Sequence, residues 1–562
     1  MKHIKVVGGH VMGSAHSRSA LRTKIHSLCF NLGLPSLFVT INPVDIHSPV
    51  ALYFAGVDPD LDRVPPEVLR TSYERAQIIA THPVATAKVF NCSIKSILKC
   101  LVLGGVLGPT KAYFGTVESQ GRGSLHLHLL IWLKHEYTPA QLKENIQNQD
   151  FRDILLKYLE DVVKEDLDLL REETDSITNE VVSVCLSTPN PASDDFHRIF
   201  CKDVVRLVET SNIHKHSTTC YKYSKGKSDT SKTCRMRMPR VLVKTSNIDL
   251  TTGQITMRRS HPWINNFNEW LIIAYRSNMD TKFIWSGNDA KALVYYITDY
   301  VTNSTLEFHD IFALAQQGIT NSIDNAIEKS RKLVLRCYNM IASQQEVSGV
   351  QVASYLMNYD DHYTTHTFRN LFLISIENYL QVELTKARLQ EKDVDEERLD
   401  DMTTPFDEEQ EEDTKQTEEQ FLSEPTQTKN GARFVMVNTR LDYQHRSQDL
   451  TALCLYDFAS HFHTKLIDKS DRHLIKNANG SEGERLDTEG TKMNERYIFE
   501  TAHSQSSSHI VIKHTNPVVP VLVGPQIPRQ QREETRERYS RALLTLFVPR
   551  ISVHDLCALN QI

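Results

Sequence analysis

The stretch that decides the fold runs from Tyr113 to Leu133 and reads YFGTVESQGRGSLHLHLLIWL. Two apolar segments flank the triplet Gly121-Arg122-Gly123, which is typical of a hairpin turn because glycine accepts positive φ. Side chains alternate between the two faces of a strand, so His126 and His128 are expected on one face and the neighbouring leucines on the other. The stretch therefore predicts an antiparallel hairpin whose second strand carries two imidazoles side by side.

This imidazole pair predicts a metal site. Two imidazoles leave a divalent cation short of ligands, and the preceding strand offers an oxygen of the right parity from Glu118, which we prefer, or from Gln120 as the alternative third ligand. A carboxylate with imidazoles suits Mg²⁺ or Mn²⁺ and leaves positions open for phosphate oxygens. The alternative interpretation is that both histidines are ordinary polar residues on an exposed strand face.

Bulk composition narrows the class of protein. The 562 residues suffice for two to four domains, and 40% apolar with 24% charged residues is ordinary for a globular protein. No apolar run reaches the length of a membrane span, and the first residues lack the apolar core of a signal peptide. Ten cysteines without disulfide-like spacing suit a reducing compartment. We therefore expect an intracellular protein that does not bind a membrane.

Charge is distributed unevenly along the chain. Residues 391–420 hold fifteen acidic and three basic side chains, a local charge of −12, so the rest of the chain carries +6 of the total of −6. That acidic segment has too few apolar residues to fold alone and is predicted to be a disordered linker. Residues 214–244 hold nine basic side chains against one aspartate, a concentration expected where nucleic-acid phosphates are bound; a solvated basic loop is the alternative interpretation. The predicted DNA-binding residues are Lys222, Lys225, Lys227, Arg235, Arg237 and Arg240.

The same basic segment contains residues suited to a structural zinc ion. His214, His216, Cys220 and Cys234 offer the imidazole and thiolate ligands of a tetrahedral Zn²⁺ site, although their spacing is not that of a CxxC knuckle. Cys201 is a substitute ligand. The alternative is two buried cysteines beside two exposed histidines.

Other segments predict a mixed fold. A capped helix is expected over 13–29, a strand over 36–42, helices over 66–80 and 83–101, and a strand over 283–285. Helices are also expected over 143–173, 310–345 and 350–386. A helix beginning near Asp289 would stack Tyr296 on Tyr300, four residues apart, which in isolation is more typical of core packing than of function. The expected class is α+β, a small antiparallel sheet backed by helices, with further largely helical regions and a disordered acidic linker.

Taken together, these segments resemble the Rep, or HUH, endonuclease region of Helitron rolling-circle transposases. The residues that carry the resemblance are LFVTINPVD near position 40, GRGSLHLHLLIWL, and YYITDYVTNS with its paired tyrosines. The HKHSTTC…CRMRMPR segment is similar to fungal copies, and the resemblance covers roughly residues 10–385. No GxxxxGK[ST] phosphate loop occurs, so the chain resembles a copy without the helicase domain and a motor is not expected.

The resemblance implies a domain plan. It comprises an HUH-type nuclease core with the metal-binding hairpin (1–175), the basic, zinc-binding segment (176–262), the tyrosine helix with further helices (263–388), the acidic disordered linker (389–432), and a C-terminal region of unknown role (433–562).

The resemblance also implies a function: a nuclear endonuclease and strand transferase for single-stranded DNA at transposon ends. Tyr296 and Tyr300 would be the catalytic nucleophiles, with a helicase acting in trans. Asp299 and Asn303 stand where many relatives carry lysine, which weakens phosphate neutralisation. A phenol has an unperturbed pKa near 10, so its attack needs help from the metal, a base or a bound water. The alternatives are a decayed or co-opted nucleic-acid-binding remnant of such a transposase and a metal-dependent phosphoesterase of small substrates that needs no tyrosine pair.

Overall fold

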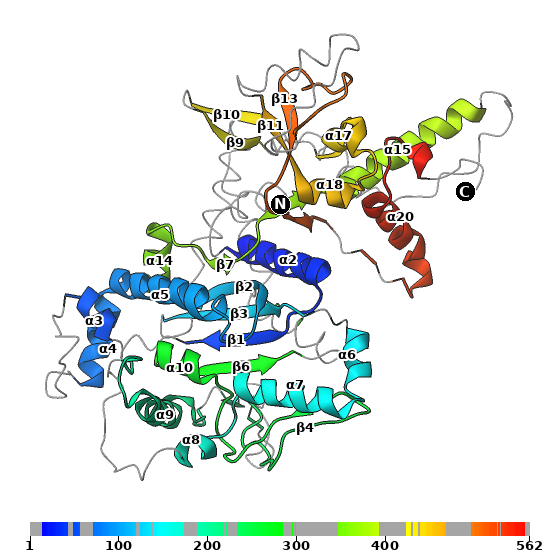
Figure 1. Ribbon diagram of the computed structural model, residues 1–562. Coiled ribbons are helices and arrows are strands. Elements are labelled where there is room, and N and C mark those ends of the chain that lie inside the picture. The colour runs from blue at the N-terminus through cyan, green and yellow to red at the C-terminus, as the bar shows by residue number, and fades with distance from the viewer. Residues whose placement is uncertain are drawn as a thin grey trace, which may run out of the picture. The chain divides into compact units, whose positions relative to one another are not determined.

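The computed structural model of the chain divides into two compact units, residues 1–365 and residues 366–562, each with its own hydrophobic core (Figure 1). The residues that the structure describes are 14–42, 49–56, 71–119, 124–135, 137, 139–172, 188–217, 220–221, 233–234, 236–284, 295, 298, 347–392, 423–428, 431–436, 439–467, 496–524, 527–528 and 530–556. Within these ranges, no helix combines the length and the apolar character needed to cross a bilayer.

The elements of the first unit are, in chain order, α2 (Ala15–Leu32), β1 (Leu37–Ile41), α3 (Pro49–Phe54), α4 (Ser72–Thr81), α5 (Pro83–Ile97), η3 (Leu98–Val102), β2 (Thr110–Ser119), β3 (Leu125–Leu133), α6 (Pro139–Asn145), α7 (Gln149–Val162), α8 (Asp168–Glu172), α9 (Phe196–Leu207), η4 (Val208–Asn212), β4 (Asn247–Ile248), β5 (Ile255–Thr256), α10 (Glu269–Tyr275), β6 (Met279–Phe283), α14 (Gly349–Leu356) and β7 (His362–Thr364).

A five-stranded sheet organises this unit, with the strand order β6-β1-β3-β2-β7 and every neighbouring pair antiparallel. The central strand β3 pairs with β1 through Leu129 and Val39, and with β2 through Leu129 and Gly115. The predicted hairpin and the strand before it are therefore confirmed as adjacent members of one antiparallel sheet.

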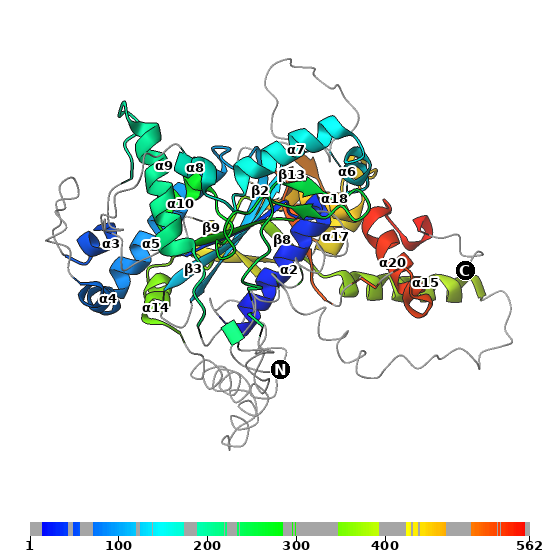
Figure 2. The ribbon, with the colours of Figure 1, turned by 90° about the horizontal axis from the view of Figure 1, so that it is seen from below.

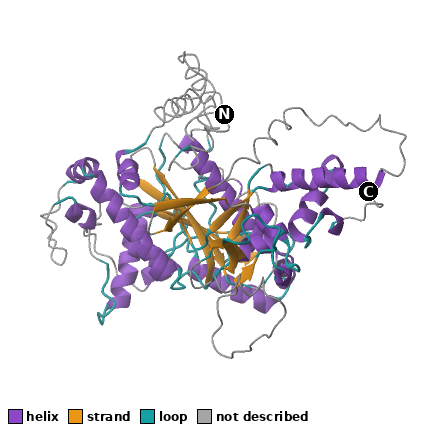
Figure 3. Ribbon diagram, turned by 90° about the horizontal axis from the view of Figure 1, so that it is seen from above, coloured by secondary structure: helices purple, strands orange, loops and turns teal. Residues whose placement is uncertain are grey.

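One face of the sheet builds the hydrophobic core. Leu125, Leu127 and Leu129 of β3 point into it, where they join apolar side chains of α5, α9 and α10. Helix α5 contributes Phe90 and Ile94, which lie on one helical face because they are four residues apart. Figure 3 distinguishes the helices of the chain from its strands by colour.

Helix α2 lies against the opposite face, and Figure 2 shows it and α7 on opposite sides of the sheet. Its first turn is capped by Ser14, whose side chain accepts a hydrogen bond from the Ser17 amide. It ends before Gly33, which adopts the positive φ of 85° that glycine permits, and the Gly33 carbonyl accepts a 2.9 Å hydrogen bond from the Trp132 indole of β3. The Ser-capped helix predicted near residue 14 is thus confirmed, and its far end is fixed to the sheet.

The second unit comprises β8 (Phe368–Leu371), α15 (Leu373–Lys392), β9 (Ser423–Thr428), β10 (Gly431–Met436), α17 (Thr439–Gln444), η7 (Gln448–Leu450), α18 (Leu455–His461), β11 (Phe462–Leu466), β12 (Arg496–Ile498), β13 (His509–Lys513), β14 (Val519–Leu522), η8 (Glu533–Thr535), α20 (Arg536–Phe547) and η9 (Val553–Asp555). Its sheets have the orders β11-β13-β12, β14-β8 and β10-β9, of which only the β14-β8 pair is parallel among the described strands.

Three predictions of secondary structure were wrong. The helix expected over 143–173 is divided into α6, α7 and α8, because residues 146–148 and 163–167 are not helical. The continuous helix expected over 350–386 is interrupted, because residues 362–364 pair with β2 and residues 368–371 pair with β14. The strand expected over 283–285 ends at Phe283, since all five residues of β6 pair with β1. In the segments 350–386 and 283–285, the pairing of short stretches with distant strands determines the secondary structure, and the local sequence pattern did not reveal that pairing.

The observed class is α+β with a small antiparallel sheet backed by helices, as expected. The unit boundary after residue 365 falls inside the predicted 263–388 segment. The predicted boundaries at 175, 262, 388 and 432 stay predictions, and most of the predicted acidic linker lies outside the described residues.

Candidate functional site

The two histidines of β3 lie on the sheet face opposite the leucine core. The register pairs His126 with Glu118 and His128 with Thr116, and directly opposed residues of antiparallel strands share a face. The two imidazoles and the preferred carboxylate are thus brought together, as predicted from their parity. Both histidines are nine-tenths buried or more, so the alternative of an exposed strand face is wrong.

His126 is held with one nitrogen available. Its Nδ1 is hydrogen-bonded to the Asn42 side chain just beyond β1, and its Nε2 has no partner among the described residues. Burial lowers the pKa of His126 to about 4, assisted by the neighbouring His128 and opposed by Glu118. A neutral imidazole with a free nitrogen is the form that binds a metal ion.

His128 is linked to the carboxylate. Its Nε2 lies 2.8 Å from a carboxylate oxygen of Glu118, and its Nδ1 lies 3.4 Å from the Thr40 hydroxyl of β1. The ring stacks on Phe38 with an interplanar angle of 3°. These contacts fix the ring from two strands, which is the support that a metal-binding imidazole needs.

The other predicted residues of this site are not placed. Gln120, Tyr296 and Tyr300 lie outside the described residues. Tyr295, which precedes Tyr296 in the sequence, is described, and its ring meets His26 of α2 edge to face at 5.6 Å. Whether the two phenols meet the histidines therefore stays a prediction.

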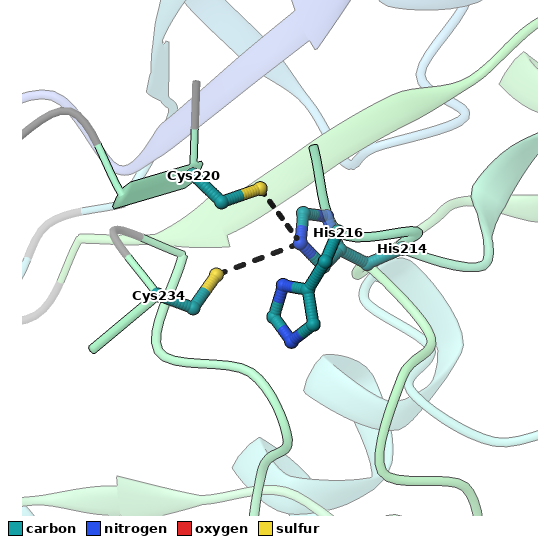
Figure 4. A group of neighbouring side chains, drawn as sticks. All are labelled: His214, His216, Cys220 and Cys234. Atoms are coloured by element: carbon teal, nitrogen blue, oxygen red, sulfur yellow. Dashed lines mark hydrogen bonds between the residues drawn. The ribbon is translucent and has the colours of Figure 1, made fainter. Parts of the chain in front are cut away.

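A second cluster joins His214, His216, Cys220 and Cys234, whose ligand atoms all lie within 4.8 Å of one another (Figure 4). The Nε2 atom of His214 lies 3.4 Å from the Cys220 sulfur and 3.5 Å from the Cys234 sulfur. Bond lengths of about 2.0 and 2.3 Å at a tetrahedral centre separate nitrogen and sulfur ligands by roughly 3.5 Å. The observed spacing therefore fits zinc.

The surroundings of this cluster favour a thiolate. Burial acts to raise the pKa of Cys220, but hydrogen bonds from His216, Ser217 and Cys234 lower it to about 7. Met238 and the partly buried Trp263 pack against the two cysteines. Cys201, the substitute ligand considered from sequence, lies elsewhere on α9, with its sulfur 3.9 Å from His197.

The predicted DNA-binding residues divide into two groups. Arg237 is exposed, whereas Arg240 is partly buried and donates a 2.6 Å hydrogen bond to the Asn266 side chain. Burial lowers the pKa of Arg240, and the nearby Asp280 opposes this shift. The Arg240 side chain therefore has a structural hydrogen bond, whereas no side-chain hydrogen bond of Arg237 occurs among the described residues. Lys222, Lys225, Lys227 and Arg235 lie outside the described residues.

Sequence reasoning missed Asp361 and His362, which it assigned to a helix. His362 pairs with Thr116 of β2, so it shares the face of His126 and His128, and its Nδ1 lies 2.8 Å from Asp361. The signal in the sequence is short: DHYTT combines aspartate with aromatic and β-branched residues, which favour a strand after a turn.

The comparisons with known proteins concern the first part of the chain. Residues 1–131 match the family model described as "Helitron helicase-like domain at N-terminus", and no curated protein matches the chain. The match includes Glu118, His126 and His128, whereas the cysteine cluster and the tyrosine pair lie beyond it. It supports the relation of this N-terminal region to Helitron transposases.

Proposed function

We propose that the chain is a metal-dependent endonuclease and strand transferase that acts on single-stranded DNA with tyrosine nucleophiles. The observation that carries the proposal is the convergence of His126, His128 and Glu118 on one buried sheet face, inside the region that matches the Helitron model. Buried imidazole and carboxylate groups on one face are the donor set that Mg²⁺ or Mn²⁺ accepts when phosphate completes its coordination.

In this proposal each residue has a distinct role. His126, His128 and Glu118 hold the cation, while Asn42 and Thr40 orient the two rings. A bound cation supplies Lewis-acid polarisation of the scissile phosphate. Tyr296 or Tyr300 attacks that phosphorus, forming a 5′-phosphotyrosine bond and releasing a 3′-hydroxyl. Because the covalent bond retains the energy of the phosphodiester, rejoining needs no ATP.

The cysteine cluster has a separate role in the proposal. Zn²⁺ held by His214, His216, Cys220 and Cys234 would fix the basic segment in a shape that lets Arg237 and its neighbours meet phosphates. The strand bound there would be single-stranded DNA at transposon ends in the nucleus, opened by a helicase in trans. Reversing the charge of Arg235 and Arg237 is expected to weaken oligonucleotide binding and flatten its salt dependence.

The experiment that tests the proposed reaction is an adduct assay. The full chain is incubated with end-labelled single-stranded oligonucleotides and Mn²⁺, and denaturing electrophoresis detects a protein–DNA adduct. We expect an adduct that disappears in the double variant Tyr296→Phe/Tyr300→Phe and in His126→Ala. Tyr295→Phe is the matched control, because this neighbouring tyrosine is exposed and is not a proposed nucleophile.

The outcomes separate the alternatives. Salt-sensitive DNA binding without any adduct, over many sequences and both metals, would favour a nucleic-acid-binding remnant. Hydrolysis of small phosphoesters that persists in the double tyrosine variant would favour a phosphoesterase. Either result contradicts the proposed strand transfer.

A further inference from the structure

Five residues form one row across the five-stranded sheet, on the face that carries the candidate metal ligands. The register pairs Asp280 with Thr40, Thr40 with His128, His128 with Thr116, and Thr116 with His362. Neighbouring strands lie about 4.8 Å apart, so His362 lies roughly 10 Å from His128, with Thr116 between them. A phosphate group bound beside His128, on the side of β2, would therefore lie between His128 and His362.

His362 is oriented by a carboxylate. Its Nδ1 lies 2.8 Å from Oδ1 of Asp361, and its ring stacks on Phe114 with centroids 5.5 Å apart. Burial acts to raise the pKa of Asp361, but the hydrogen bond and the charge of His362, together with Lys24, lower it below its usual value. An ionised carboxylate only accepts hydrogen bonds, so Nδ1 carries a hydrogen, and in the neutral ring Nε2 is the nitrogen with the lone pair. No residue in the described part of the chain occupies that Nε2.

Thr116, in the middle of the row, is a separate indication that a ligand binds here. The Thr116 side chain is 2% exposed, and its Oγ1 has no hydrogen-bond partner within the described residues. A buried hydroxyl without a partner is unfavourable, so such a group usually meets a ligand or an ordered water. Thr116 lies between His128 and His362, where a phosphate oxygen would accept its hydrogen.

Helix α2 contacts both this row and Tyr295. The Ser17 hydroxyl lies 3.4 Å from the second oxygen of Asp361, and the charge of Lys24 acts on the same carboxylate. The same helix contacts Tyr295 through His26. One helix thus touches both Asp361 and the residue that precedes Tyr296 in the sequence.

We propose that His362 is the general base of the strand-transfer reaction, with Asp361 as its positioning residue; the inference rests on the proposed function. Nε2 of His362 takes the phenol proton as the tyrosine oxygen bonds to phosphorus. The bond between phosphorus and the 3′ oxygen breaks, and the imidazolium returns the proton to that oxygen as the 3′-hydroxyl forms. Thr116 donates to a non-bridging oxygen. No oxidant or further reactant is needed.

The test measures the single-turnover rate of adduct formation by the full chain with Mn²⁺ and a labelled single-stranded oligonucleotide between pH 5 and 9. His362→Gln is expected to lower the rate by about 10²- to 10⁴-fold and to abolish the fall in rate at acidic pH. Asp361→Asn is expected to lower the rate less. Oligonucleotide affinity, measured by fluorescence anisotropy, and Mn²⁺ affinity should stay within about twofold of wild type. His135→Gln, an exposed histidine of the same unit, is the matched control.

A chemical rescue protects the test against a folding defect, because added imidazole should restore part of the rate to His362→Gly only if the fold and the rest of the site are intact. Among the described residues, Lys24 of α2 acts on the charge of Asp361, and Asp361 in turn acts on Tyr355 of α14. Lys24→Met and Tyr355→Phe therefore serve to separate these influences on the pH profile. A His362→Gln rate and pH profile equal to wild type would overturn the base assignment and leave the proposed function standing. A wild-type chain that forms no adduct would overturn both.

Discussion

The hydrogen bonds of single side chains in the candidate metal site are determined by residues on or next to the adjacent strands. His126 and His128 are two positions apart on β3, yet one bonds to Asn42 beyond β1 and the other to Glu118 on β2. The first therefore offers its Nε2, while the second must release Glu118 or share it with a cation. This asymmetry predicts that the three groups contribute unequally to metal binding.

Glu118→Gln is expected to weaken Mn²⁺ binding by about 10-fold or more, and Asn42→Ala by about 10- to 100-fold, because ligand orientation sets affinity. Isothermal titration calorimetry with the full chain measures both values. Lys111→Gln, an exposed position on the same β2 strand, is the control. Equal affinity in all four proteins would contradict the assigned ligand set.

A second prediction at this scale concerns acid stability. Burial lowers the pKa of His514 to about 4, and His463, Arg369 and His461 add to the shift. Since the ordinary value is 6.5, the unfolded chain binds more protons between pH 6.5 and 4, and the free energy of unfolding falls as the pH falls through that window. Hydrogen exchange of β13 peptides at pH 7 and pH 5 should show this loss in wild type and less of it in His514→Gln. An undiminished loss in the variant would contradict the prediction.

At the scale of elements, the close contact between β2 and β3 explains why residue 115 is a glycine. A Cβ added to Gly115 would lie 2.9 Å from the Leu127 side chain and 3.1 Å from that of Leu129. Gly115→Val is therefore expected to destabilise the first unit by about 1–3 kcal/mol through overpacking. Urea denaturation measures the effect, and Lys111→Val, at an exposed position of β2, should change stability by less than about 0.5 kcal/mol.

The cysteine cluster allows a second element-scale prediction. The purified chain is expected to hold one Zn²⁺, measured by inductively coupled plasma mass spectrometry, and Cys234→Ser should lose it. Without the ion, the loop that packs Met238 and Trp263 around the sulfurs should exchange amide hydrogens faster. Cys201→Ala removes a buried cysteine outside the cluster and should keep the ion. Zinc retention in Cys234→Ser would contradict the ligand set.

How far the elements could be predicted from sequence depends on their length and periodicity. The hairpin and α2 were predicted because alternation and capping are local signals that Leu125–Leu133 and Ser14 carry in full. Strand β7 was missed because three residues cannot establish a period, and its pairing with β2 is a contact over more than two hundred positions. The shared face of Glu118, His126 and His128 followed from parity, whereas the Asp361 and His362 pair did not, since only tertiary structure brings it to that face.

At the scale of the whole molecule, two separate cores predict two separable unfolding events. All four tryptophans precede residue 365, so their fluorescence reports only the first unit, whereas far-ultraviolet circular dichroism reports both. Leu129→Ala should lower the free energy of unfolding obtained from the fluorescence transition by about 2–5 kcal/mol. Leu455→Ala, in the second core, should leave that transition unchanged and shift only part of the dichroism signal. Equal shifts of both signals in both variants would indicate a single cooperative unit.

The central position of β3 has a genetic consequence. This strand is buried on both sides, and eight of its nine residues are buried. Deleting a single codon within it would rotate every following side chain by half a turn, driving imidazoles into hydrocarbon and leucines toward the polar face. Substitutions here damage one property at a time, whereas a one-residue deletion removes the core and the chemistry together. In a deletion scan, this segment should therefore be intolerant at every position, while the acidic tract should accept losses freely.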